Sequence, residues 1–97
     1  MTSVEVVPAI AAVAQQIVAA NGYGDVVTVH NYRSDELPLE LMGRRADILV
    51  SELIDDHLIG DGVLQSHADA RRRLLVPRPT IIPWGGKIFA WPLQMRL

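Results

Sequence analysis

Four carboxylates and one imidazole fall within twelve consecutive residues, in the stretch SELIDDHLIGDG at positions 51–62. The stretch directly follows the apolar run ADILV, which is typical of a buried strand. Acids crowded at the end of a strand repel one another, and a bound cation relieves that repulsion. The stretch therefore predicts a site for a positively charged partner. Its candidate side chains are Glu52, Asp55, Asp56, His57 and Asp61.

One hypothesis gives the acidic loop a divalent metal ion for hydrolysis. Asp55, Asp56, His57 and Asp61 offer oxygen and imidazole ligands, which suit several cations. Their spacing does not match a calcium-binding loop, and Glu52 has no role in this hypothesis. Metal analysis of protein purified without added ions would separate a metal site from a site for an organic cation.

Predicted strands and helices, which could position these acids, alternate along the chain. A helix is predicted from Pro8, which suits a first turn, to a stop at Asn21-Gly22. Its apolar residues recur at helical spacing, at Ile10, Val13, Ile17 and Val18. The other predicted elements are strands at 3–7, 26–30 and 45–52, a helix within 62–75, and two short strands within 76–97.

The alternation of strands and helices predicts an open α/β sheet with flanking helices. The strand at 45–52 is almost wholly apolar in its middle, as expected when helices cover both faces of a parallel sheet. Ligands of such sheets bind beyond the carboxyl ends of the strands. Three predicted strands end in acids, at Glu5, at Ser34-Asp35-Glu36 and at Glu52.

Composition narrows the setting of this 97-residue chain. There is no cysteine, so a disulfide scaffold and a thiolate zinc site are excluded. The net charge of -2 argues against direct binding to nucleic acid, and the basic run Arg71–Arg73 is expected to be the solvated last turn of a helix. No apolar run is long enough to span a membrane. We expect a soluble chain that binds no membrane, in the cytoplasm or the nucleus.

Several segments together resemble the protein arginine N-methyltransferase family. They are VPAIAAVAQQIVAANG, VVTVHNYRSDEL, ADILVSEL, the acidic loop, LLVP and TIIP, and they cover nearly the whole chain. The loop is the most specific part. It is most similar to the monomethylating branch, whose loop has an initial Glu, an Asp three residues on, and Leu-Ile-Gly-acid-Gly.

The resemblance implies transfer of a methyl group from S-adenosyl-L-methionine to an arginine side chain of a protein substrate. Two carboxylates of one loop would hold the planar guanidinium by paired hydrogen bonds. Glu52 matches the first of the family's two glutamates, which lie nine residues apart, and Asp61 stands at the second position. Asp61 is one methylene shorter, which bears on rate or on substrate choice.

Further roles also follow from the resemblance. Asp55 would contact substrate, influencing the size of the pocket or its preference for basic neighbours of the arginine. Glu5 corresponds to the acid that accepts hydrogen bonds from the cofactor's ribose, and Ser34 and Asp35 correspond to the turn that meets the adenine. His57 has no counterpart in the family pattern.

The resemblance divides the chain into two parts. Residues 1–82 would form part of a Rossmann-like, class I S-adenosylmethionine-binding domain, and residues 83–97 the first strand of a β-barrel substrate domain. The family's glycine-rich cofactor loop does not occur in this sequence, so the cofactor site is expected to be incomplete. We therefore expect a fragment that is inactive alone and that forms homo-oligomers or exchanges segments between chains.

Structural roles remain open for several of these residues. Glu5 could be a solvated strand end, Ser34 and Asp35 could be ordinary turn residues, and Asp61 could cap the following helix. The chain as a whole could be a catalytically silent, methyltransferase-like interaction module. Four more side chains are expected to be structural: His30 and His67, which could also be exposed, and Trp84 and Trp91, in a core or an interface.

Overall fold

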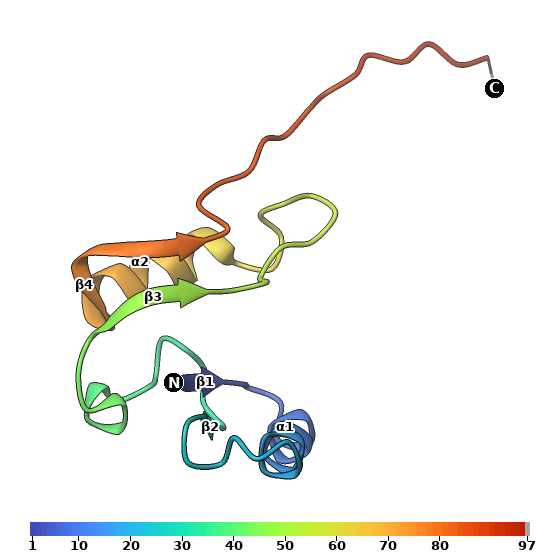
Figure 1. Cartoon of the computed structure of the whole chain (residues 1–97). Helices are drawn as coiled ribbons and strands as arrows, with labels where there is room; N and C mark the ends of the chain where they lie inside the picture. Colours follow the sequence, from blue (N-terminus) through green and yellow to red (C-terminus); the bar gives the residue numbers. More distant parts are fainter. Residues whose placement is uncertain (97) are drawn as a thin grey trace.

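The computed structural model describes residues 1–96 and contains two parallel, two-stranded sheets, β1–β2 and β3–β4 (Figure 1). Each pair of strands is joined by a helix, so each half of the chain is a βαβ unit. The predicted α/β class is confirmed. The elements are β1 (Thr2–Val4), α1 (Pro8–Ala20), β2 (Thr28–His30), the 3₁₀ helix η1 (Leu39–Met42), β3 (Ala46–Val50), α2 (Val63–Arg73) and β4 (Leu75–Ile82).

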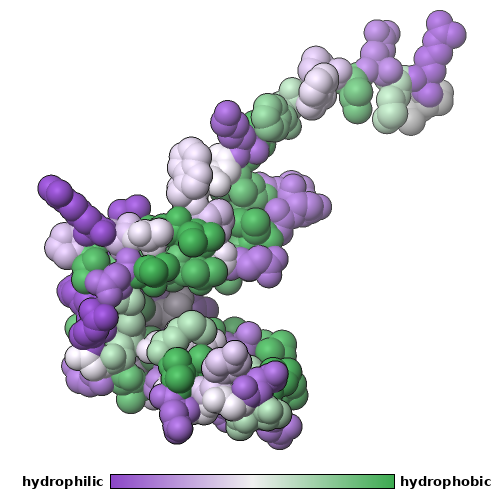
Figure 2. Space-filling view, in the orientation of Figure 1, coloured by the Kyte–Doolittle hydropathy of each residue, from purple (hydrophilic) through white to green (hydrophobic). Residues whose placement is uncertain are grey.

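The expected single sheet is split in two. In the first unit Val4 pairs with His30, and in the second Val50 pairs with Ile82, but the sheet ladders of residues 1–96 do not join β1 to β3. Figure 1 shows the second unit above the first, and Figure 2 shows a hollow between them. One edge of β1 and one edge of β3 therefore lack a strand partner within the described chain.

Helix α1 begins and ends as its sequence predicts but buries a different face. Pro8 lies in its first turn, and Gly22, with a φ of 76°, follows its end. The buried residue is Ala11, whereas Ile10, Val13 and Ile17 are each more than half exposed. The apolar stripe that predicts the helix thus does not face the core of this chain. Small alanine side chains let the helix lie close to the short β1–β2 sheet.

The β3–β4 sheet has one bare face. Ile48, Val50 and Ile82 are all more than half exposed, and the strand register places them on the same side of the sheet. Helix α2 contacts β4, and its buried residues Val63 and Ala70 contribute to the core. The prediction that β3 is covered on both faces is wrong for this chain, because the described residues supply a helix for one face only.

Residues 83–96 extend away from the two units as an irregular arm (Figure 1). The first of the two predicted terminal strands is present as β4, and the second does not form in the arm. Trp84 and Trp91 are 92% and 80% exposed, so the core alternative is wrong within residues 1–96, and the alternative that they lie in an interface stays a prediction. The predicted barrel strand at 83–97 includes Leu97, which lies outside the described residues.

Membrane-spanning potential is absent from the helices of the described chain. Neither α1 nor α2 combines the length and apolar character that a bilayer crossing requires.

One arginine connects the two units. The Arg73 guanidinium, in the last turn of α2, donates to the backbone oxygens of Ser34 and Leu37, at 2.9 and 3.1 Å. The same guanidinium pairs with Asp69, with an Nη2–Oδ2 distance of 2.7 Å. Leu37, which is 1% exposed, lies in the turn that Arg73 holds. The expected solvated end of α2 is thus correct for exposed Arg71 but wrong for half-buried Arg73.

The pair of arginines at Asp69 stabilises its charged form. Hydrogen bonds from Arg73 first, and from Arg72 second, lower the pKa of Asp69 from 3.8 to about 2. A carboxyl whose pKa is lower in the folded than in the unfolded chain stabilises the fold above its unfolded pKa. That stabilisation falls away as the pH drops from about 4 through about 2.

We predict that Arg73→Met lowers the free energy of unfolding by roughly 1–3 kcal/mol, because it removes charge-assisted hydrogen bonds and leaves backbone oxygens without a donor. Urea unfolding at pH 7 measures this. The matched control is Arg71→Met in the same turn, where the side chain is exposed and a change within about 0.5 kcal/mol is expected. The loss of stability between pH 4 and pH 2 should also be smaller in Arg73→Met. Equal effects of the two variants would contradict the role of Arg73.

Candidate active site

The carboxyl ends of the strands carry the acids that the sequence singles out. Glu5 follows β1, Ser34 and Asp35 follow β2, and Glu52 follows β3 after Ser51. The labelled arrows of β1, β3 and β4 point the same way in Figure 1. Glu5 and Glu52 therefore follow the carboxyl ends of β1 and β3, where ligand-binding groups of a parallel sheet are expected, whereas Ser34 and Asp35 lie beside the later turns of α2.

Glu52 and Asp61 lie at opposite ends of the loop that joins β3 to α2. Both carboxylates are exposed, and neither forms a hydrogen bond or ion pair with another side chain in residues 1–96. The cap of α2 is Gly62, without a side-chain hydrogen bond, so the alternative that Asp61 caps this helix is wrong. Both acids remain available to accept hydrogen bonds from a ligand.

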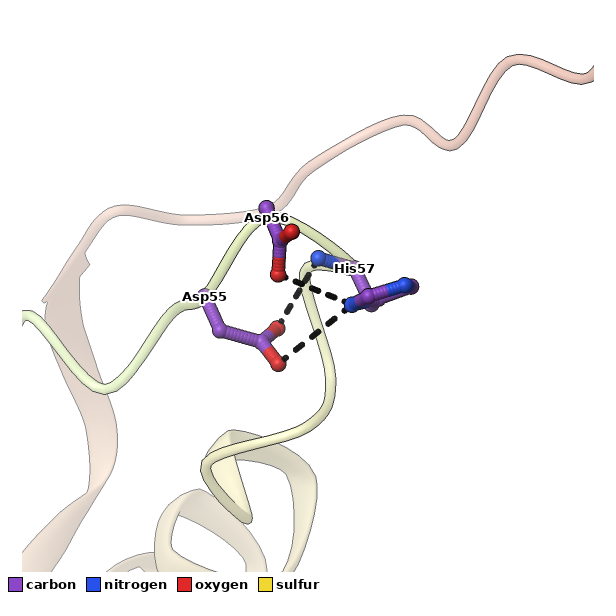
Figure 3. A group of neighbouring side chains, drawn as sticks. All are labelled: Asp55, Asp56 and His57. Atoms are coloured by element: carbon purple, nitrogen blue, oxygen red, sulfur yellow. Dashed lines mark hydrogen bonds and ion pairs between the residues drawn. The ribbon is translucent and has the colours of Figure 1, made fainter.

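Asp55 differs from these two acids because its carboxylate is engaged by the loop itself. Its Oδ1 accepts a hydrogen bond from the backbone amide of His57 at 3.1 Å (Figure 3) and another from the backbone amide of Gly60 at 3.0 Å. The side chain is 25% exposed. The structure thus places Asp55 within the fold of the loop, a position that its sequence spacing does not reveal.

The three consecutive residues Asp55, Asp56 and His57 bring potential metal ligands within 4.8 Å of one another (Figure 3). His57 Nδ1 lies 2.8 Å from an Asp56 oxygen, and both side chains are at least 80% exposed. Asp61, the fourth residue of the metal hypothesis, is not part of this group. An exposed cluster whose acids already bind the loop's own amide and imidazole groups gives little support to a catalytic metal site.

At the end of β1, Glu5 shapes the turn into α1. Its Oε1 accepts a hydrogen bond from the Val7 amide at 2.7 Å, and its own amide donates to His30 on β2. Asn31 donates from its side chain to the backbone oxygens of Glu5 and Val6. Sequence reasoning missed Asn31, because its role depends on the parallel pairing of two strands that lie far apart in sequence.

Asp35, in the turn after β2, lies beside a hollow. The hollow has a volume of about 510 Å³ and is lined by Asp35 together with Gln65, Ala68, Asp69 and Arg72 of α2. Arg33 pairs with both Asp35 oxygens, at 3.0 and 2.8 Å, and this hydrogen bonding lowers the pKa of Asp35. Ser34 takes part in the fold through its backbone oxygen, which accepts from Arg73.

His67 of α2 anchors the start of the acidic loop. Its Nε2 lies 2.6 Å from the Ser51 hydroxyl, and the Ser51 amide donates to Ile82 of β4. Ser51 directly precedes Glu52, so this contact fixes the backbone from which Glu52 emerges. The expectation of a structural or exposed role for His67 agrees with its position, but the sequence gives no signal for its partner.

Known proteins similar to this chain indicate its family. The chain is 38% identical over 85 residues to an arginine N(omega)-methyltransferase of Streptomyces achromogenes subsp. streptozoticus. It is 39% identical over 85 residues to protein arginine N-methyltransferase 7 of Drosophila melanogaster. Each match covers 87% of this chain. The chain belongs to the protein arginine N-methyltransferase family. No family model matches the sequence.

The chain also matches a solved structure, the Trypanosoma brucei PRMT1 enzyme-prozyme heterotetrameric complex with AdoHcy. The TM-score is 0.74 at 28% identity, over 82% of this chain and 24% of that chain. The likeness confirms a class I methyltransferase fold. The chain spans 24% of the Streptomyces relative and 12% of the Drosophila relative, so it corresponds to a segment of these proteins.

Proposed function

We propose that this chain forms the arginine-binding loop and part of the cofactor site of a protein arginine N-methyltransferase. The observation that supports this most directly is the pair of exposed, unengaged carboxylates of Glu52 and Asp61, at the two ends of one loop beyond the sheet. Their partner would be a guanidinium, whose fixed fork of donors suits two carboxylates.

S-adenosyl-L-methionine supplies an electrophilic methyl group on a sulfonium when it is bound. The described residues fit part of this molecule. Glu5 offers a carboxylate for ribose hydroxyls at the end of β1, and Asp35 borders a hollow large enough for an aromatic ring. Glu5, Ser34 and Asp35 would therefore hold the nucleoside end. The sequence contains no glycine-rich loop for the methionine end, so these residues account for only part of the site.

When bound, S-adenosyl-L-methionine would supply its sulfonium methyl group to a guanidino nitrogen of the substrate and would leave as the neutral thioether, and the methylated nitrogen would give up one proton. Glu52 and Asp61 orient the guanidinium and stabilise its charge at the nitrogens that do not react. Asp61 places its carboxylate one methylene closer to its backbone than a glutamate would, so the two acids would hold the guanidinium asymmetrically.

We predict that Glu52→Gln lowers methyl transfer at least about a hundredfold, because a neutral amide cannot hold the guanidinium by paired charge-assisted bonds. The assay uses the 97-residue chain and a chimera in which it replaces the matching segment of the Streptomyces relative. Transfer of labelled methyl from S-adenosyl-L-methionine to a Gly-Arg-rich peptide is measured, with free arginine as the competing substrate.

The matched control is Glu40→Gln, an exposed acid on η1, which should leave transfer unchanged. Label on the peptide that is lost in Glu52→Gln and retained in Glu40→Gln supports the proposal. Label only on free arginine would contradict the protein substrate, and a silent chimera would favour the interaction-module alternative.

We also propose that the chain associates with further copies of itself. Its bare sheet face is formed by Ile48, Val50 and Ile82, and one edge of β1 and one edge of β3 lack a strand partner within the described residues. Apolar faces and open strand edges favour association or exchange of segments between chains. The solved Trypanosoma complex is a heterotetramer, which is compatible with an assembling family.

Association should weaken in Val50→Lys, because a charge at the centre of the bare face must be desolvated in any contact. Sedimentation over a range of protein concentrations tests this, with Gln16→Lys on the exposed side of α1 as the control. A chain that remains monomeric at high concentration, or equal association of both variants, would contradict the role of this face.

A further inference from the structure

The segment 55–60 is held by one residue. The backbone oxygen of Asp55 accepts from the Leu58 amide at 3.0 Å, and its Oδ1 accepts from the amides of His57 and Gly60. Three amides of the loop thus converge on a single residue. Donors on a backbone turn that share one carboxylate and one carbonyl fix the path of the chain between them.

Gly60 is closely fitted to this arrangement. The atoms nearest to a Cβ placed on Gly60 would be those of the Asp55 carboxylate, with Cγ at 2.7 Å and Oδ2 closer still. Real Cβ atoms are not found at such distances, so a side chain here would force the carboxylate to turn away. Turning it away breaks both hydrogen bonds that Oδ1 accepts. The Asp55 carboxylate can therefore occupy this position only because Gly60 has no side chain.

Leu58 provides a second sign that the loop is held in shape. Its φ of 70° lies in the left-handed region, which branched and bulky residues rarely adopt. Such a conformation persists where surrounding contacts fix it. The amides of His57 and Gly60, which lie on either side of Leu58 in the sequence, both donate to Asp55. The Leu58 side chain also packs closely against Gly86, where an added Cβ would lie 2.8 Å from Leu58 Cδ1.

We propose that Asp55 is a positioning residue that folds the acidic loop, and that Gly60 is required because its missing side chain leaves room for the Asp55 carboxylate. The consequence for catalysis rests on the proposed function. Glu52 lies three residues before Asp55, and Asp61 directly follows Gly60, so the turn between them sets the separation of the two proposed clamp acids. Asp55 thereby acts through Glu52 and Asp61 without contacting the substrate.

Hydrogen exchange of the amides of His57 and Gly60, measured by NMR on the 97-residue chain, tests the proposal. Asp55→Ala and Gly60→Ala should each raise these exchange rates about tenfold, because each frees the amides from the carboxylate. The sharper test is the double variant. In the Asp55→Ala background Gly60→Ala should add less than about twofold, because the carboxylate it would displace is already gone.

Two controls complete the experiment. Gly24→Ala is the same change at a glycine whose added Cβ has no neighbour within 4 Å, and it should leave the loop unchanged. Asp55→Asn keeps an oxygen acceptor and should restore most of the protection. Unchanged amide shifts in α2 would show that each variant is folded.

Equal effects of Gly60→Ala with and without Asp55 would overturn the proposal, as would slow exchange in Asp55→Ala. The measurement needs no methyl donor, so it can fail while the proposed methyl transfer stands. Conversely, a chimera that transfers no methyl group would contradict the proposed function and leave the exchange result unaffected.

Discussion

The guanidinium of Arg73 is the contact on which the arrangement of this chain depends. It reaches from the last turn of α2 to two backbone oxygens of the turn after β2, and Asp69 holds it in place from one helical turn away. The β1–β2 and β3–β4 ladders do not join within the described chain, so this tie has no strand pairing to assist it.

A division of labour among the loop acids follows from their contacts. The Asp55 carboxylate accepts hydrogen bonds from amides of the loop, whereas the exposed carboxylates of Glu52 and Asp61 accept none from residues 1–96. Ser51 and His67 fix the point where the loop leaves β3, and Gly62 opens helix α2 at the other end. The backbone that carries these acids is thus held by amides and by neighbouring elements, and a bound guanidinium would relieve the repulsion between acids that meet at it.

The sequence predicts the α/β class and the strand ends because alternation of strand and helix patterns is a local property. It cannot predict which faces are covered, because coverage depends on which other elements are present. Ile48 and Val50 have the composition of a doubly buried strand yet face solvent here, and the stripe through Val13 on α1 does the same. Both follow from packing partners that the described residues do not include.

Among the site residues, the loop and its exposed acids could be predicted from composition and from family resemblance. The fit between Asp55 and Gly60 could not, because it depends on the left-handed conformation of Leu58 between them. The contact between Ser51 and His67 likewise depends on how α2 lies against β3. Residue types and their spacing therefore predict which side chains could bind a ligand, whereas the residues that position them can be identified only from the path of the backbone.

Recognition of a guanidinium by Glu52 and Asp61 is tested by an NMR titration of the labelled 97-residue chain with an arginine-containing peptide and with the same peptide carrying lysine in its place. We predict that the arginine peptide shifts the amide signals of Glu52 and Asp61 and that the lysine peptide does so far more weakly, because an ammonium lacks the planar fork. Equal shifts with both peptides, or shifts confined to residues 55–57, would show that the two acids do not recognise a guanidinium.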